Sequence, residues 1–186
     1  MINPHYPELN LFFLKIHIWG VFAALAFILC YLISLKRSKD KDTTTNILIL
    51  LFISGILGAR LFYIIEYFSF YSNNLLSVFY VWDGGISSSG GVLIALIASY
   101  IYTKKKKISF LEHANILAPG LAVAGIVGRL GCFFGDIHLG KPTTLPWAII
   151  QESQLRHPVS LYYSIAFLIT LILIYIITRY KKNIEI

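Results

Sequence analysis

The chain has 186 residues, of which 57% are hydrophobic and 13% are charged. Soluble domains are about 45–50% apolar, so this composition excludes an ordinary soluble domain and indicates one integral membrane domain over residues 1–186. The formal net charge of +7 lies mostly in short clusters between the apolar runs. Because no basic face carries interleaved aromatic side chains, the charge does not indicate nucleic-acid binding.

Five apolar runs are predicted to form transmembrane helices, since a helix needs about 20 residues to cross the hydrocarbon. The first follows MINPHYPELN, which contains Glu8 and no basic n-region, so we expect a retained span and not a cleaved signal peptide. Cys30 and Cys132 fall within predicted spans, which argues against a disulfide scaffold, and the sequence has no CxxC or Cys/His cluster that would indicate a metal site. In chain order, the predicted spans are Ile16–Leu35, Ile47–Tyr67, Ile86–Tyr102, Ala114–Phe134 and Val159–Ile177.

The charges between these spans predict an orientation. Loops 36–42 and 104–107 and the tail from Arg179 are basic, whereas loops 68–85 and 135–157 contain few lysines or arginines. The positive-inside rule then places the N-terminus outside and the C-terminus in the cytoplasm. Five spans also put the termini on opposite sides. The two interpretations agree on an all-α integral membrane protein with about five transmembrane helices.

Two arginines lie inside the apolar runs, where a charge costs roughly 2.5–3.5 kcal/mol on insertion scales. Arg60 stands in the second predicted span, and Arg129 stands near the end of the fourth. Such charges mark sites for ions, anionic substrates or lipid headgroups, although Arg129 can instead extend to the nearby membrane surface. Small residues of the fourth span recur at helical spacing, which predicts close helix packing. They are Gly120, Ala124, Gly128 and Gly131.

Four segments combine glycines with polar side chains in patterns that can carry chemistry. Glycine pairs let the backbone approach a ligand, and the N-terminus of a following helix offers free N–H groups to an anion. We expect the four segments to meet near the outer half of the membrane. They are GARLFY (58–63), VWDGGISSSGG (81–91), GRLGCFFGDIHLGKPT (128–143) and RHPVSLYY (156–163).

In this order the motifs resemble those of the prolipoprotein diacylglyceryl transferase family, over roughly Leu14 to Tyr175. The resemblance implies transfer of the diacylglyceryl group of phosphatidylglycerol to the lipobox cysteine of a preprolipoprotein, with release of glycerol phosphate. It implies a multi-pass protein of the bacterial cytoplasmic membrane whose partners are phosphatidylglycerol, the preprolipoprotein signal peptide and the bilayer, with no cofactor. The matching stretches are Trp19-Gly20, Gly58–Tyr63, Trp82–Ser87, Gly90-Gly91, Gly128–Phe133, Gly140–Thr143, Leu145–Trp147, Arg156–Pro158 and Leu161-Tyr162.

The resemblance also implies roles for single residues. A thiol must lose its proton to a base before it can attack, and cationic donors must hold the phosphate as its charge grows. Arg129 and Arg60 are implied to grip the phosphate. The available bases, among which none is favoured, are His157, His138, Asp136 and Glu66. The other implied substrate-binding residues are Gly84, Gly85, Ser89, Gly90, Gly91, Gly128, Gly131, Arg156 and Tyr162.

The chain departs from the family pattern at several places. Ser89 stands where the family usually has a histidine, Cys132 replaces an asparagine, and Ile137 takes the place of an acid next to Asp136. The sequence ends at Ile186, where family members usually continue into two further helices. The alternative function is therefore that of a non-catalytic paralog, which binds anionic phospholipid or a lipoprotein precursor.

Overall fold

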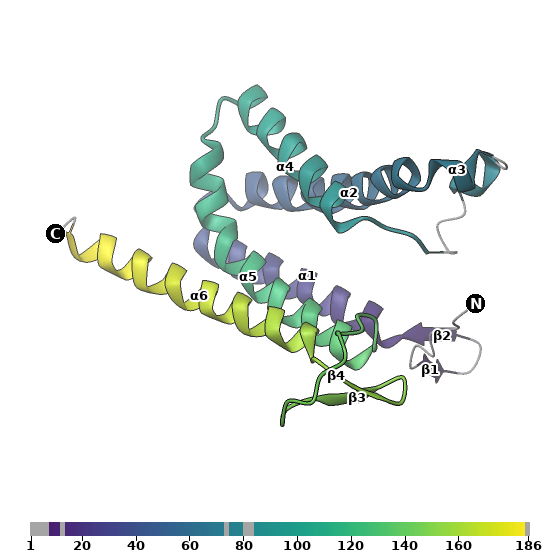
Figure 1. Cartoon of the computed structure of the whole chain (residues 1–186). Helices are drawn as coiled ribbons and strands as arrows, with labels where there is room; N and C mark the ends of the chain where they lie inside the picture. The colour runs from purple at the N-terminus through teal and green to yellow at the C-terminus, as the bar shows by residue number, and fades with distance from the viewer. Residues whose placement is uncertain (1–7, 12–13, 73–74, 80–83, 185–186) are drawn as a thin grey trace. The chain divides into compact units, whose positions relative to one another are not determined.

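The computed structural model describes residues 8–11, 14–72, 75–79 and 84–184 (Figure 1). The chain divides into two compact units, which we describe separately. Unit 1 comprises Met1–Arg37 and Asn115–Ile186, and unit 2 comprises Ser38–Ala114. The expectation of one membrane domain over the whole chain stays a prediction.

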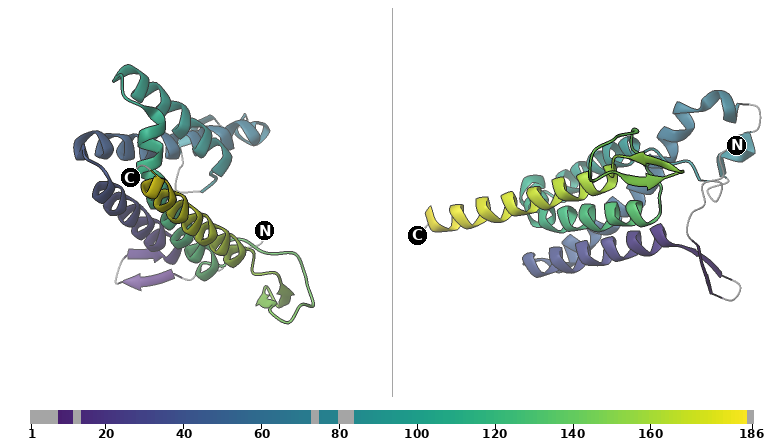
Figure 2. Two further views of the ribbon diagram at one scale, coloured as in Figure 1. Left: turned by 90° about the vertical axis from the view of Figure 1, so that its left-hand side faces the viewer. Right: turned by 60° about the horizontal axis from the view of Figure 1, so that its bottom comes forward.

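Unit 1 contains three long helices that lie side by side in Figures 1 and 2, α1 (Ile18–Arg37), most of α5 (Phe110–Phe134) and α6 (Val159–Ile184). Two antiparallel hairpins accompany them, neither of which was expected from the sequence. The first pairs β1 (Glu8–Leu11) with β2 (Leu14–His17), and the second pairs β3 (Ile149–Gln151) with β4 (Gln154–Arg156). The second hairpin follows α5 and precedes α6 in the chain, so it is part of the polar loop that connects them.

Glycines of α5 let the helices of unit 1 approach closely. A Cβ at Gly120 would lie 2.8 Å from the Cys30 carbonyl oxygen of α1, and one at Gly131 would collide with Phe22 of the same helix. Gly125, which the predicted face left out, lies against the Phe167 ring of α6. Gly128 differs, since a Cβ there would meet no described atom within 4 Å. Helix packing therefore explains three of these glycines and does not explain Gly128.

Unit 2 pairs α2 (Lys41–Glu66) with α4 (Ser88–Lys105), and between them lie α3 (Phe68–Tyr71) and the short 3-10 helix η1 (Leu75–Phe79). Asp40 caps the start of α2, where its Oδ1 accepts the Thr43 amide at 3.0 Å. A side-chain acceptor at this position satisfies one of the N–H groups that a helix start leaves unpaired.

Within the described residues, four helices are long and apolar enough to cross a membrane, and much of their aliphatic surface is exposed, as expected for contact with lipid chains. They are Ile18–Arg37, Lys41–Glu66, Phe110–Phe134 and Val159–Tyr180. The third predicted span corresponds to α4, whose 18 residues include Lys104 and Lys105. The protein is thus a multi-pass helical membrane protein, while the count of five spans and the orientation stay predictions.

Candidate active site

In unit 2, Arg60 binds the turn that leads into α4. It is only 9% exposed, and its guanidinium donates to the carbonyl oxygens of Gly84 and Gly85 at 2.5 and 3.0 Å and to Val78 at 3.2 Å. The same guanidinium lies 5.5 Å from the centre of the Tyr71 ring. Buried cations need such partners because an uncompensated charge loses its hydration. The structure therefore gives Arg60 a positioning role in the turn, and its predicted grip on phosphate stays a prediction.

The backbone conformation of the turn explains why residues 84 and 85 are glycines. Gly84 and Gly85 have φ of +79° and +84°, in the left-handed region that side chains disfavour. A Cβ at Gly85 would also collide with the ring of Tyr63. Trp82 and Asp83, which belong to the same predicted motif, lie outside the described residues.

Beside the turn, a short chain of hydroxyl groups reaches Glu66. The Ser87 hydroxyl donates to the Glu66 carboxylate at 3.2 Å and lies 2.9 Å from the Ser89 hydroxyl. The Ser87 amide also donates to the Ala59 carbonyl at 2.9 Å, which ties the start of α4 to α2. The sequence singled out Ser89 and Glu66 but not Ser87, the residue that joins them.

The second glycine pair packs the helices of unit 2 together. A Cβ at Gly90 would collide with Phe62 and would lie 2.8 Å from the Gly58 carbonyl oxygen, and one at Gly91 would lie 3.0 Å from the Gly55 carbonyl oxygen. Close backbone approach thus accounts for both positions. Their predicted role in substrate binding stays a prediction.

In unit 1, Arg129 lies against α6. Its guanidinium carbon is 4.6 Å from the centre of the Tyr163 ring, which is within the range of a cation–π interaction. The ring face attracts the cation without using its N–H groups, so these donors stay available to an anion. Arg129 also acts on His138 in the loop after α5, where its positive charge disfavours a second cation.

The loop after α5 is fastened to the start of α6 through its backbone. Gly140 lies against His157, where an added Cβ would be 2.9 and 3.0 Å from the backbone carbon and nitrogen of that histidine. The His157 amide donates to the Lys141 carbonyl at 3.0 Å. Arg156 Nη1 donates to the Gly140 carbonyl at 3.0 Å, and Arg156 Nη2 donates to the Gln154 side chain at 3.0 Å. Arg156, which was expected to bind substrate, thus holds this loop.

His157 belongs to a chain of three side chains. Trp147 Nε1 donates to the Tyr162 hydroxyl at 2.7 Å, and that hydroxyl lies 3.1 Å from His157 Nδ1. The indole nitrogen can only donate, so the Tyr162 oxygen accepts there and its own proton is free to go to Nδ1. Asp136, with φ of +51°, is held elsewhere, because its Oδ1 accepts from Gln151 Nε2 at 2.5 Å. Gln151 is only 5% exposed, and the sequence motifs did not single out this partner of Asp136.

The structure thus divides the predicted residues between its units. Unit 1 brings together Arg129 with Tyr163, Arg156 with Gly140, and His157 with Tyr162. Unit 2 brings together Arg60 with the glycine turn, and Glu66 with the serines. The expected meeting of all four segments stays a prediction. In the described part of the chain, no cluster of His, Cys, Asp or Glu suited to a metal ion is found.

A family model for prolipoprotein diacylglyceryl transferase matches residues 8–186. The chain belongs to this family. It is 35% identical over 178 residues to a phosphatidylglycerol–prolipoprotein diacylglyceryl transferase of Finegoldia magna, with 93% of this chain and 72% of the relative covered. It is 36% identical over 161 residues to the protein of the same name in Clostridioides difficile, with 84% and 64% covered.

A Clostridium botulinum relative of the same name is 33% identical over 172 residues, with 87% of this chain and 68% of the relative covered. The chain therefore spans between 64% and 72% of the length of these three relatives. As a member of the prolipoprotein diacylglyceryl transferase family, it carries both arginine motifs and the Arg156-His157-Pro158 segment inside the matched region.

We expect the imidazole of His138 to titrate below its usual pKa of 6.5, because partial burial, and after it the charge of Arg129, lower that pKa. His138 then stays neutral to a lower pH than a free histidine. NMR of the imidazole protons in detergent measures the midpoint. The Arg129→Gln variant should raise it, and the Arg179→Gln variant should not, because residue 179 lies about 24 Å from residue 163 along α6. A midpoint at or above 6.5 in the unaltered protein would contradict this account.

Proposed function

We propose that this protein transfers the diacylglyceryl group of phosphatidylglycerol to the cysteine thiol of a prolipoprotein, at the cytoplasmic membrane of a bacterium. The observation that carries the proposal is the family match over residues 8–186. The names of the relatives supply the lipid and the protein substrate. The arrangement around Arg129, described above, supports the same chemistry.

The reaction makes separate demands on the protein. A C–S bond forms between the thiolate and the glyceryl carbon, and the C–O bond to the phosphate breaks. The thiol proton goes to a base, and glycerol phosphate leaves with additional negative charge. A guanidinium held beside this phosphate stabilises the charge as it grows, and its planar fork matches two phosphate oxygens. Arg129 fits this role, because Tyr163 holds it by the ring face and leaves its N–H donors accessible.

Among the four candidate bases, we assign His138 as the group that accepts the thiol proton. The other three already take part in hydrogen bonds. His157 Nδ1 lies at hydrogen-bond distance from the Tyr162 hydroxyl. Asp136 Oδ1 accepts from Gln151, and Glu66 Oε1 accepts from Ser87. Within the residues that the structure describes, no hydrogen bond to the His138 imidazole is observed. Its lowered pKa keeps it neutral at neutral pH, and a neutral imidazole is the form that accepts a proton.

The test uses purified protein in detergent with phosphatidylglycerol and a lipobox peptide. Mass spectrometry should detect a diacylglyceryl adduct on the peptide cysteine and released glycerol phosphate. The adduct should vanish with Arg129→Ala. A folded protein that binds phosphatidylglycerol and forms no adduct would replace this proposal with that of a non-catalytic lipid-binding paralog.

A further inference from the structure

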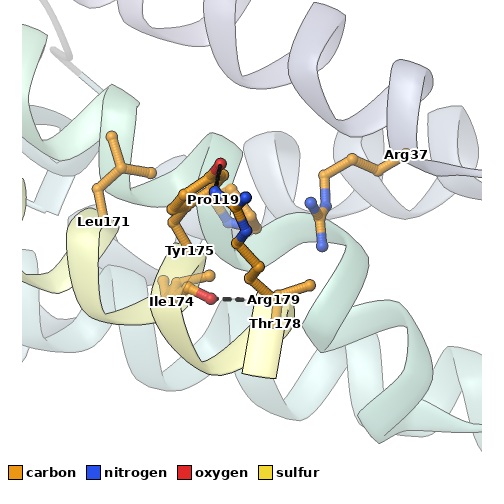
Figure 3. A pocket seen from close by; sticks show the side chains of 7 residues that line it. All are labelled: Arg37, Pro119, Leu171, Ile174, Tyr175, Thr178 and Arg179. Atoms are coloured by element: carbon orange, nitrogen blue, oxygen red, sulfur yellow. Dashed lines mark hydrogen bonds between the residues drawn. The ribbon is translucent and has the colours of Figure 1, made fainter. Parts of the chain in front are cut away.

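The far end of unit 1 contains an open groove that the proposed reaction does not use. It has a volume of about 460 Å³ and lies between the last residue of α1, the middle of α5 and the last turns of α6 (Figure 3). Pockets that hold small ligands usually measure about 300–1,000 Å³. The groove is therefore large enough for a lipid headgroup and the first carbons of its chains, while its open side leaves the rest of a lipid outside.

One face of α6 forms the apolar wall of the groove. Leu171, Ile174 and Tyr175 follow the spacing of a single helical face, and Arg179 continues that face by one turn. Pro119 of α5, which is buried, contributes to the opposite side. The walls are thus aliphatic and aromatic, as acyl chains require.

The groove carries two positive charges. Arg37 extends toward it from α1, and Arg179 stands in it from α6 (Figure 3). Among the described residues, no acidic side chain lines the groove. The Arg179 guanidinium donates to the Tyr175 hydroxyl at 3.4 Å, and an ion pair for either arginine is not observed among the described residues. The C-terminal ends of α1 and α6 contribute about half a negative charge each, so two full positive charges outweigh them.

The groove is remote from Arg129. Tyr163, which holds the Arg129 guanidinium, and Arg179 are sixteen positions apart on α6, which is about 24 Å along a helix. Both Arg37 and Arg179 lie at ends of helices that are long and apolar enough to cross a membrane. Helix ends of this kind lie at the level of lipid headgroups, where basic side chains meet lipid phosphates.

We propose that this groove binds an anionic phospholipid, with its phosphate between Arg37 and Arg179 and the start of an acyl chain along Leu171 and Ile174. The charges select an anion, and the apolar face selects a lipid over a free phosphate. This site is separate from the transfer reaction, and the proposal does not rest on the proposed function.

The groove is tested with phosphatidylglycerol that carries a photoactivatable group in its acyl chain. The probe is added to the detergent-solubilised Arg129→Gln variant, so that the proposed active site contributes little. After illumination and digestion, we expect mass spectrometry to find label on the α6 peptide that contains Leu171 and Ile174. Labelling confined to other helices would overturn the proposal.

Affinity gives the second measurement, by native mass spectrometry of phosphatidylglycerol adducts. Charge-assisted hydrogen bonds are strong, so Arg37→Gln combined with Arg179→Gln should weaken binding about tenfold or more. Lys36→Gln combined with Lys39→Gln removes the same charge from residues that do not line the groove, and should change binding little. An equal loss of affinity in both double variants would show that the lipid is attracted by the overall charge, and would contradict a specific site. Phosphatidylcholine adducts as abundant as those of phosphatidylglycerol would contradict the proposal as well. Cross-links between two protein copies at α6 would also contradict it, because a second copy would then occupy the groove.

Discussion

Arg129→Lys is expected to lower kcat/KM for peptide lipidation by about 10²- to 10³-fold, the loss that follows removal of one donor to a developing oxyanion. Lysine keeps the positive charge but presents a single ammonium group in place of a planar fork that binds two oxygens. It also lacks the flat face that stacks 4.6 Å from the centre of the Tyr163 ring. The measurement is the initial rate of adduct formation at several lipid concentrations.

Tyr163 supplies matched controls for this substitution. Tyr163→Phe keeps the ring under the guanidinium and should leave kcat/KM close to that of the unaltered protein. Tyr163→Leu removes the ring face, frees the arginine and should give an intermediate loss. If Arg129→Lys retains full turnover, the residue acts through charge alone, as in membrane topology, and the phosphate-gripping role is wrong.

Gly58→Ala is expected to produce a large loss of stability. Its Cβ would lie 2.5 Å from the Cβ of Ile94 and 2.8 Å from the Gly90 carbonyl oxygen. Neither neighbour is the end of a flexible side chain, so α2 and α4 must move apart. Overpacking of this kind costs about 1–3 kcal/mol. For a chain of this size, that corresponds to a decrease in Tm of roughly 2–12 °C, at about 2–4 °C per kcal/mol.

Gly55→Ala is the matched control, on the same helix and three residues earlier. Its Cβ would lie 4.0 Å from the Ala95 Cβ and from the Gly91 carbonyl oxygen, which is ordinary contact. Alanine also favours helix over glycine by about 1 kcal/mol, so this variant should keep or raise Tm. Thermal unfolding in detergent compares the two. Equal Tm values for both variants would show that Gly58 is not at a tight helix crossing.

The long elements were predictable because their apolar runs are long and their ends carry local signals. The fourth predicted span ends at Phe134, as α5 does, directly before Gly135, and the fifth begins at Val159, as α6 does, directly after Pro158. Glycine and proline stop or start a helix through the backbone alone. The second hairpin escaped prediction because its strands have only three residues each, too few for an alternating pattern.

The arrangement of the site was less predictable than its residues. Arg60 was identified by its charge in an apolar run, but its carbonyl partners lie 17 to 25 positions later in the chain. The hydrogen bond between Gln151 and Asp136 likewise joins residues 15 positions apart, one of which lies in a hairpin that the sequence did not reveal. Side-chain hydrogen bonds to distant backbone leave no periodic trace in a sequence.

Each unit uses an arginine to hold a loop by its backbone, Arg60 at the glycine turn and Arg156 at Gly140. A guanidinium remains charged at every pH at which a protein stays folded. These two loops therefore keep their anchors from mildly acidic to strongly alkaline buffers. An acidic limb in the pH–rate profile would then report the titration of another group in the site and not the loosening of these two loops.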